Sequence, residues 1–593
     1  MDDVISPDEA GSLHGLFLER VKRTPGKVAY RYFRHNAWRE FSWLKMQEQV
    51  ARWQKALSGL GLQRGDRVAI MLRNCPVWVM FDQAAMSLGL VTVPLYTVDR
   101  PDNVAYIVND ANVKVLLFES AEQWQALSTV RDKLGGVLRF VSVDNLRGDA
   151  SLVPMGEFLP KDAELMPPVP LSVNDLASII YTSGTTGKPK GVMLSHANML
   201  TNAHACLDTF HVRGDDVFLS FLPLSHTFER TLGYYLTVMT GATVAFARSI
   251  QQLSEDLQSI RPTLLISVPR IYERIYAAIR TRLEEGAFLN RRLFHFAVDT
   301  GWARFEHQQG RGSWQPSFLL WPLLEKLVAK KILHRLGGRL RVAFSGGAAL
   351  SPEVSRVFIG LGLPIVQGYG LTETSPVISG NRLDDNQPDS VGHPVRNVEV
   401  KLGNQSVLLV KGPNVMMGYW NNPEATNATI DSDGWLNTGD IAHISGSGHI
   451  YITGRIKEII VMSNGEKIPP NDMELAILHD PLFDQVMISG EARPYLVALA
   501  VLNPEVWLHF THEVGIRPDM PETLTDSRVE AKVLRRIARN LRGFPGYARV
   551  NRVLLLKEPW TIDNGLLTPT LKIRRDEVSR RFESQIGQLY EGH

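Results

Sequence analysis

Hydrophobic positions recur with helical spacing in the first 60 residues, and after this part of the chain short apolar runs alternate with helical patterns. Periodicities around Leu16 and Trp53 predict two helices within the first 60 residues. Arg67–Met71 has the character of a short buried strand of the parallel-sheet type, Val113–Phe118 has the character of another strand, and Val77–Leu88 between them has a helical pattern. Strands and helices that alternate at this spacing are typical of an α/β fold.

The polar stretch Ile180–Gly191 lies between two apolar runs and gathers glycines, hydroxyl side chains and lysines. Glycines let successive backbone N–H groups point at one anion, and hydroxyl and ammonium groups add donors. The spacing differs from the P-loop, because Thr182 stands where the first Gly belongs and Pro189 interrupts the end. The strand patterns on both flanks predict a loop that joins two strands. Two interpretations stay open here: a phosphate-binding loop, or a hairpin turn with solvated lysines.

Two loops of small residues follow the strand-like runs Arg341–Phe344 and Pro364–Gln367. Because α/β sheets bind ligands beyond the carboxyl ends of their strands, these loops are candidates to frame a flat ring, on which Tyr369 could stack. Glu373 offers a hard oxygen ligand for Mg²⁺ beside a triphosphate. Its alternative role is that of an acidic residue at a helix N-terminus.

From Val391 onward, short alternating strands predict a small β-rich subdomain. Within it, Gly434–Asp440 places a carboxylate beside a glycine turn, which suits a ribose diol or, alternatively, an Asx-type turn. Thr453–Glu458 has the character of a domain junction. Near the end, Lys572 follows a Gly/Thr/Pro loop, a position from which its side chain could reach a neighbouring domain.

Residues 291–341 contain ten Lys/Arg against three Asp/Glu, interleaved with aromatic residues. A basic, aromatic segment can lie at an anionic lipid interface. The alternative is a helical insertion whose aromatic side chains form a core and whose cations are solvated.

Composition narrows the class of protein. A chain of 593 residues predicts more than one domain, and 44% hydrophobic with 21% charged residues is typical of soluble globular proteins. The net charge of +2 gives no general attraction to nucleic acid, and Cys75 and Cys206 are too few for a disulfide framework or a thiolate zinc site. With no signal-peptide pattern and no apolar run of membrane-spanning length, we predict a cytoplasmic protein, peripheral on the inner membrane face if residues 291–341 bind lipid.

Five motifs occur in the order and spacing of the adenylate-forming superfamily: Tyr181–Gly191, Tyr369–Glu373, Trp435–Asp440, Gly454–Arg455 and Thr568–Lys572. The chain therefore resembles acyl-CoA synthetases, amino-acid adenylation domains and luciferases over nearly its whole length. Within the superfamily it is similar to long-chain fatty acyl-CoA synthetases, judged by Leu222–Arg230, the basic aromatic insertion and the Leu566–Lys572 ending.

The resemblance implies an AMP-forming ligase of fatty acid metabolism, with fatty acid, ATP and CoA as substrates and Mg²⁺ as metal. It implies a phosphate-binding group formed by Thr182, Ser183, Gly184, Thr185, Thr186, Gly187 and Lys190. Adenine would be framed by Gly346, Gly347, Ala348 and Tyr369, and ribose held by Asp440 and Arg455. Thr372 and Glu373 would serve the α-phosphate and Mg²⁺, and Lys572 would bridge the carboxylate and the α-phosphate.

The resemblance also implies the domain organisation. A large N-terminal domain (1–454) of α/β subdomains with a small β subdomain would precede a smaller, mobile α+β domain (455–593). The hinge would be Lys457, where many relatives have Asp. His226, Glu229 and Arg230 would stand at the acyl pocket or its gate, or form a polar cluster that ties a strand to a helix.

Two rival functions remain at this point: an acyl-AMP ligase that loads a separate carrier protein, and a non-catalytic, nucleotide-binding, membrane-associated protein. The sequence is compatible with an oligomer.

Overall fold

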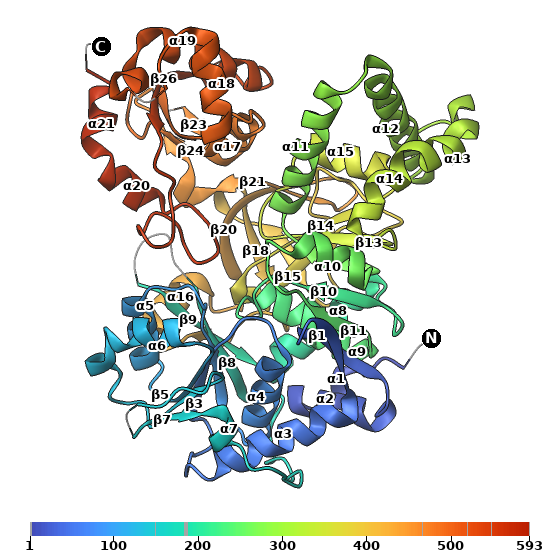
Figure 1. The fold of residues 1–593 in the computed structure, drawn as a ribbon, viewed down its shortest axis with the longest axis vertical. Coiled ribbons are helices and arrows are strands. Elements are labelled where there is room, and N and C mark those ends of the chain that lie inside the picture. Colours follow the sequence, from blue (N-terminus) through green and yellow to red (C-terminus); the bar gives the residue numbers. More distant parts are fainter. Residues whose placement is uncertain are drawn as a thin grey trace.

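The computed structural model describes residues 3–148, 150–182, 188–464, 466–518, 520–546 and 548–591. Two large mixed sheets and three smaller sheets are interleaved with helices, which confirms the predicted α/β class with a small β subdomain and a smaller C-terminal α+β unit. Figure 1 shows the C-terminal elements on one side of the molecule and the helices of residues 269–333 on the other.

The first large sheet has the order β19-β9-β8-β4-β3-β5-β6-β7, with parallel pairing from β8 to β7. The strands Arg67–Met71 and Val113–Phe118 have the bounds that the sequence predicted, because a strand buried on both faces is marked by a mostly hydrophobic sequence. The strands are β3 (Arg67–Met71), β4 (Val91–Pro94), β5 (Val113–Phe118), β6 (Arg139–Ser142), β7 (Leu152–Pro154), β8 (Leu176–Thr182), β9 (Lys190–Ser195) and β19 (Gly418–Tyr419). The neighbouring helices are α3 (Trp43–Ser58), α4 (Pro76–Ser87), α5 (Pro101–Asp110), α6 (Ala121–Ser128) and α7 (Met155–Phe158).

The second large sheet has the order β16-β15-β14-β13-β12-β10-β11-β1-β2 and is parallel from β14 to β1. Its strands are β1 (Val28–Arg34), β2 (Ala37–Ser42), β10 (Val217–Ser220), β11 (Thr243–Phe246), β12 (Leu264–Ser267), β13 (Val342–Ser345), β14 (Ile365–Gly370), β15 (Val377–Gly380) and β16 (His393–Pro394). Its helices are α1 (Pro7–Ala10), α2 (Leu13–Arg23), α8 (His196–Phe210), π-helical η2 (Glu229–Tyr235), α9 (Leu236–Thr240), α10 (Leu253–Ile260), α11 (Pro269–Glu285), α12 (Phe288–Gln308) and α15 (Pro352–Gly360).

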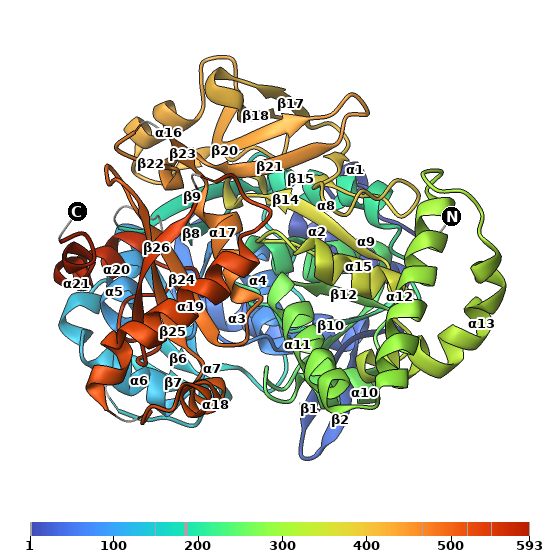
Figure 2. The same cartoon turned by 90° about the horizontal axis from the view of Figure 1, so that it is seen from above.

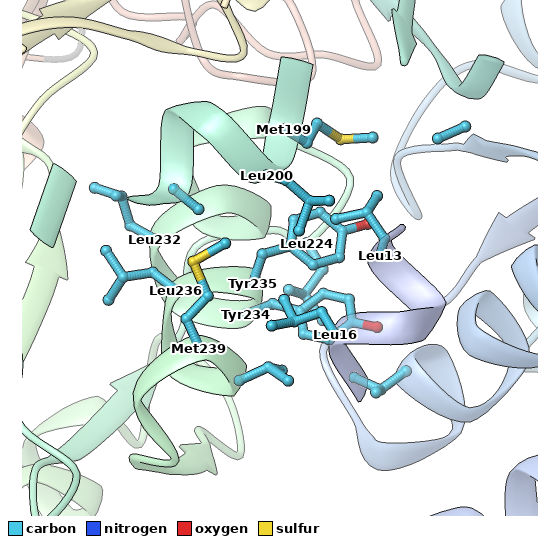
Figure 3. Close-up of a cluster of buried hydrophobic side chains, with 14 of the residues drawn as sticks. Leu13, Leu16, Met199, Leu200, Leu224, Leu232, Tyr234, Tyr235, Leu236 and Met239 are labelled. Atoms are coloured by element: carbon cyan, nitrogen blue, oxygen red, sulfur yellow. The ribbon is translucent and has the colours of Figure 1, made fainter. Parts of the chain in front are cut away.

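The core between these sheets is continuous. Figure 3 shows Tyr234 and Tyr235 of η2 lying against Leu13 and Leu16 of α2, with Leu200 of α8 beside them. All of these side chains are almost completely buried. Burying a large apolar side chain is worth about 1.5–3 kcal/mol, so this cluster fixes η2 against the N-terminal helices.

The remaining strands form small sheets around the junction towards the C-terminus. A four-stranded sheet contains β17 (Glu399–Leu402), β18 (Val407–Lys411), β20 (Leu436–Ile444) and β21 (Ile450–Arg455), with α16 (Pro423–Thr429) nearby. The 3-10 turn η8 (Ile456–Glu458) then leads to β22 (Ile460–Val461) and β23 (Lys467–Ile468). The last sheet has β24 (Phe483–Ser489), β25 (Leu496–Leu502) and β26 (Val550–Leu556), covered by α17 (Pro470–Leu478), α18 (Pro504–Val514), α19 (Ser527–Asn540), α20 (Arg575–Arg581) and α21 (Glu583–Gln588).

The basic aromatic segment is helical and contains α12, α13 (Trp321–Leu324) and α14 (Lys330–Leu333). Figure 2 shows α12 and α13 at the periphery of the molecule. Phe294 and Trp321 are buried in a small core of its own, whereas Trp314 is 55% exposed. None of the described helices combines the length and the apolar character needed to cross a membrane.

Candidate active site

The predicted phosphate loop joins two strands, as its flanks indicated. β8 and β9 pair antiparallel, with Thr182 opposite Lys190 at the open end of the hairpin. Ser183, Gly184, Thr185, Thr186 and Gly187 lie outside the described residues. The exposed Lys190 ammonium lies 5.0 Å from the centre of the Tyr419 ring.

Tyr419 connects the phosphate loop to Glu373. Its hydroxyl donates to Glu373 Oε1 at 2.8 Å, and the Met416 N–H donates to the Glu373 carbonyl at 2.9 Å. Burial, and then the neighbouring Glu373 carboxylate, raise the pKa of Tyr419. Glu373 lies in the short 3-10 turn η6 (Thr372–Thr374), directly after β14 and its Gly370 end. Tyr419 thus contacts Glu373 through its hydroxyl and Lys190 through its ring, so these two predicted site residues share one neighbour.

Sequence reasoning missed Tyr419. It lies in the two-residue strand β19, which pairs with β9 through Tyr419 and Val192. So short a strand has no detectable periodicity, and the only local signal is the adjacent Gly418, whose φ of 136° a residue with a side chain rarely adopts.

Asp440 and Arg455 face each other across neighbouring strands. They are register partners in the antiparallel pair β20–β21, and Arg455 Nε donates to Asp440 Oδ1 at 2.7 Å. The Tyr369 hydroxyl donates to the other oxygen, Oδ2. Burial and then Asp440 raise the pKa of Tyr369 well above its usual range. The structure therefore brings the predicted ribose-binding residues together with the predicted adenine-stacking tyrosine.

The Asx-type turn proposed as an alternative for this motif is present, but it belongs to a different residue. The Gly439 N–H donates to Asn437 Oδ1 at 2.9 Å, and Gly439 has a φ of 71°. The Asp440 carboxylate takes no part in that turn and points instead to Arg455 and Tyr369.

The small residues after β13 form an open ledge. Gly346 is buried and its N–H donates to the Ser267 carbonyl at 3.1 Å, whereas Gly347 and Ala348 are exposed. A Cβ at Gly346 would lie 2.9 Å from Phe228 Cζ, so only glycine fits without movement of that ring. A ledge with no side chain larger than a methyl group allows a flat ring to approach the backbone.

Lys572 approaches this group from the C-terminal unit. Its backbone is held by Thr568, whose N–H donates to the Lys572 carbonyl at 2.8 Å and whose Oγ1 accepts from the Lys572 N–H at 3.0 Å. The residue is exposed, yet the pKa of its ammonium is lowered, first because surrounding protein displaces water and second because Arg455 is near. Asp440 and Glu373 act on Lys572 in the opposite direction, so all of these charges lie within electrostatic reach of one another.

His226 belongs to the same neighbourhood. Its Nδ1 accepts from the Phe228 N–H at 3.2 Å. Burial, followed by the charge of Lys572, lowers the pKa of His226 to about 4. A neutral imidazole beside an ammonium fits a position near the reacting carboxylate.

Glu229 is buried within η2 and keeps its proton at neutral pH. Burial raises the pKa of Glu229 from its usual 4.5 to about 8. A Cβ at Gly233 would lie 2.3 Å from Glu229 Oε1, so the glycine one turn later makes room for the acid.

The stability of the protein should therefore fall with pH through Glu229. Between pH 4.5 and about 8 the folded state holds a proton that the unfolded chain releases, so each pH unit in this window costs about 1.4 kcal/mol. Glu229→Gln should remove this loss, so that its melting temperature relative to the parent rises from pH 5 to pH 8. The exposed Glu424→Gln serves as the control; a constant difference between Glu229→Gln and the parent across this range would contradict the assignment.

Arg230 is fully buried and engaged in a different network. Its guanidinium pairs with Asp82 of α4 at 2.6 Å and donates to Ser178 of β8 at 2.8 Å and Thr92 of β4 at 2.9 Å. Tyr235 accepts from Nε at 2.9 Å. These contacts favour, for Arg230, the polar cluster that ties η2 to the eight-stranded sheet over a place at the acyl gate.

Comparisons with known proteins agree over nearly the whole chain. The family model described as AMP-binding enzyme matches residues 17–420, and that described as AMP-binding enzyme C-terminal domain matches residues 457–593. The chain is 34% identical to long chain acyl-CoA synthetase 6, peroxisomal, of Arabidopsis thaliana over 93% of this chain and 82% of that protein. It is 30% identical to the long-chain-fatty-acid–CoA ligase FadD15 of Mycobacterium bovis over 98% of this chain and 97% of that protein.

A solved structure supports the fold. The anthranilate CoA ligase AuaEII in complex with anthranoyl-AMP superposes with a TM-score of 0.74, covering 99% of both chains at 19% identity. At that identity the likeness concerns the fold alone.

Proposed function

Because the chain belongs to the AMP-binding enzyme family, we propose that it activates long-chain fatty acids with ATP and transfers the acyl group to CoA. The resemblance to the adenylate-forming superfamily is confirmed by the family matches. The observation that carries the proposal is that Lys572 lies within electrostatic reach of Arg455, Asp440 and Glu373, so that the last four of the five predicted motifs each place a charged residue in one neighbourhood. Relatives named as long-chain acyl-CoA synthetases and ligases support the substrate class.

The proposed reaction has two steps. In the first, a carboxylate oxygen of the fatty acid bonds to the α-phosphorus of ATP, and the bond to pyrophosphate breaks. In the second, the CoA thiol gives up its proton and bonds to the acyl carbon, and AMP leaves. Both substrates of the first step are anions, so their approach requires cationic and hydrogen-bonding groups placed in advance. Lys572 would face the carboxylate and α-phosphate, and Lys190 would steady the departing pyrophosphate.

Glu373 fits a role in holding Mg²⁺. Its Oε1 accepts the Tyr419 hydrogen bond, and no described residue bonds its Oε2, which is free for a ligand. A half-buried carboxylate next to a triphosphate is the setting in which Mg²⁺ is commonly held, through one protein oxygen and several phosphate oxygens and waters. Bound there, Mg²⁺ would neutralise phosphate charge, while Thr372 would contact the α-phosphate.

Pyrophosphate release tests the function. Purified chain with ATP, Mg²⁺ and palmitate should release pyrophosphate, and adding CoA should yield palmitoyl-CoA. A holo-carrier protein in place of CoA examines the rival acyl-carrier ligase, and a series of acids from short to very long examines chain preference. ATP binding without pyrophosphate release on adding any acid would favour the non-catalytic alternative and contradict the proposal.

We propose further that residues 1–454 and 455–593 form two domains that turn about Lys457. Lys457 is exposed and lies in the 3-10 turn η8, directly after β21. Separate hydrophobic clusters on the two sides of this turn support the division. In the family, such a rotation exchanges the residues that face the substrate between the two steps.

Lys457→Pro should separate the two half-reactions. Proline fixes φ near −65° and restricts the preceding residue, so one orientation of the domain should be favoured. We expect one half-reaction to fall by at least about tenfold, because a closing motion that gates chemistry would be blocked, while the other is retained. Single-turnover assays of adenylate formation and of thiolysis measure this, with Lys457→Ala as control. If both rates survive in Lys457→Pro, the hinge lies elsewhere.

Residues 291–341 are proposed to contact anionic lipid peripherally. Part of the segment forms a core, but Trp314, Leu319 and Leu323 are more than half exposed. Exposed apolar groups beside an excess of lysine and arginine are suited to an anionic bilayer surface. Co-sedimentation with phosphatidylglycerol vesicles, but not with phosphatidylcholine vesicles, tests this; absence from both pellets would contradict it. The cytoplasmic location stays a prediction, and so does the oligomeric state.

A further inference from the structure

Two histidines and an aspartate meet where the nine-stranded and four-stranded sheets join. His393 Nε2 lies 2.9 Å from Asp385 Oδ2, and His449 Nε2 lies 3.4 Å from Asp385 Oδ1. The ligand atoms of these three residues all lie within 4.8 Å of one another. The two imidazole rings are 4.1 Å apart between centroids. Two nitrogens and a carboxylate thus lie close enough together to share one ion.

Backbone contacts fix this arrangement. The Val391 N–H donates to the Ile450 carbonyl at 2.8 Å, and the Ile450 N–H donates to the Gly392 carbonyl at 3.0 Å, which ties β21 to the segment before β16. β16 pairs with β15 in the nine-stranded sheet, so these bonds connect that sheet to β21. Gly448 has a φ of 89°, and a Cβ there would lie 3.2 Å from His393 Nδ1. A glycine at this turn therefore allows the His393 ring to approach His449.

His449 has an unmet hydrogen-bonding requirement. Its side chain is fully buried, and Nε2 makes no well-aligned hydrogen bond to any described residue, although it lies 3.4 Å from Asp385 Oδ1. Leaving a buried polar atom unsatisfied costs about 1–3 kcal/mol, so a ligand at this nitrogen would remove a penalty. The opposite nitrogen, Nδ1, lies 3.1 Å from Ser447 Oγ. A hydrogen bond on the far side of the ring is how metal-binding histidines are usually oriented.

We propose that Asp385, His393 and His449 bind one divalent transition-metal ion, with Zn²⁺ as the leading candidate. Imidazole nitrogen with one carboxylate suits Zn²⁺ and related ions, and three protein ligands leave room for water. Mg²⁺ prefers oxygen ligands, so this site differs in chemistry from the one at Glu373. His449 lies six residues before Arg455 at the other end of β21, which corresponds to about 20 Å at the rise of a strand. Because the metal site is this far from the nucleotide-binding residues, we assign it the structural role of connecting the two sheets.

Metal titration of the full chain tests the proposal. The protein is stripped with EDTA, dialysed and titrated with Co²⁺ followed by visible absorption, and with Zn²⁺ by calorimetry. We expect one ion per chain at this site, retained in 10 mM Mg²⁺, and a higher melting temperature with Zn²⁺ bound. His393→Gln and Asp385→Asn, at partly exposed positions that should tolerate change, should weaken binding by at least about tenfold.

The matched control is His443→Gln. His443 is an exposed histidine on β20, which belongs to the four-stranded sheet that contains β21. The substitution His443→Gln should leave the metal titration unchanged. The proposal is overturned if the parent chain shows no saturable Co²⁺ or Zn²⁺ binding. It is overturned equally if His393→Gln and Asp385→Asn bind as His443→Gln does, since the metal would then lie elsewhere.

Discussion

Replacing Lys572 with alanine (Lys572→Ala) is expected to lower the rate of acyl-adenylate formation by roughly 10²–10³-fold. The Lys572 ammonium of the C-terminal unit interacts electrostatically with Arg455, Asp440 and Glu373. Removing a single donor aimed at charge that develops during reaction typically costs about 3–4 kcal/mol. Thiolysis of supplied acyl-AMP should be largely spared, because the carboxylate and α-phosphate are already joined.

The two half-reactions should be measured separately, by pyrophosphate release and by thioester formation from acyl-AMP. Lys557→Ala is a suitable control, since Lys557 is an exposed lysine of the same unit and donates to the Pro518 carbonyl. An equal loss in both half-reactions would remove Lys572 from the adenylation step.

Replacing Arg230 with methionine (Arg230→Met) is expected to destabilise the protein strongly rather than to alter its acyl preference. Asp82 and Arg230 are both fully buried, and removing one partner of such a pair typically costs about 3–5 kcal/mol because the other charge is left uncompensated. The midpoint temperature of the first unfolding transition measured by calorimetry should fall.

A second variant distinguishes the structural role from a gate. Replacing both charges, as Arg230→Met with Asp82→Leu, removes the uncompensated carboxylate and should recover much of the lost thermal stability. If Arg230→Met instead keeps its melting temperature but changes the chain-length profile, then Arg230 acts at the acyl gate.

The predictable parts of this fold are those encoded by local pattern. The largely apolar run Val113–Phe118 became β5 with the same bounds, because five of its six residues are buried and only Lys114 is polar. The hairpin β1–β2 was missed, since its two-residue turn is His35-Asn36 rather than a glycine-containing pair. Both turn residues have positive φ, 51° and 55°, as a type I′ turn requires.

Site residues could be predicted as motifs but not as neighbours. Asp440 and Arg455 are opposed only because β20 and β21 pair in one register, which spacing along the chain does not reveal. The sequence left two roles open for Arg230, a place at the acyl gate or in a polar cluster. Its contacts could not be predicted, because its partners Asp82, Thr92 and Ser178 lie on elements far away in the sequence. Tyr419 lay in no periodic pattern and had only the adjacent Gly418 as a local signal, and its role depends on a contact made in three dimensions.

The position of Arg455 has a consequence for the order of events. Arg455 ends β21 and stands two residues before Lys457, while its partner Asp440 lies on the adjoining strand. Although Arg455 is numbered as the first residue of the second domain, it precedes the pivot, so a turn at Lys457 would leave the Asp440–Arg455 pair with the N-terminal body throughout the cycle. The nucleoside would then stay bound at one site through both steps. Pyrophosphate could leave and CoA could bind while the AMP moiety kept its contacts, so the acyl-AMP intermediate would not have to dissociate and bind again between the steps.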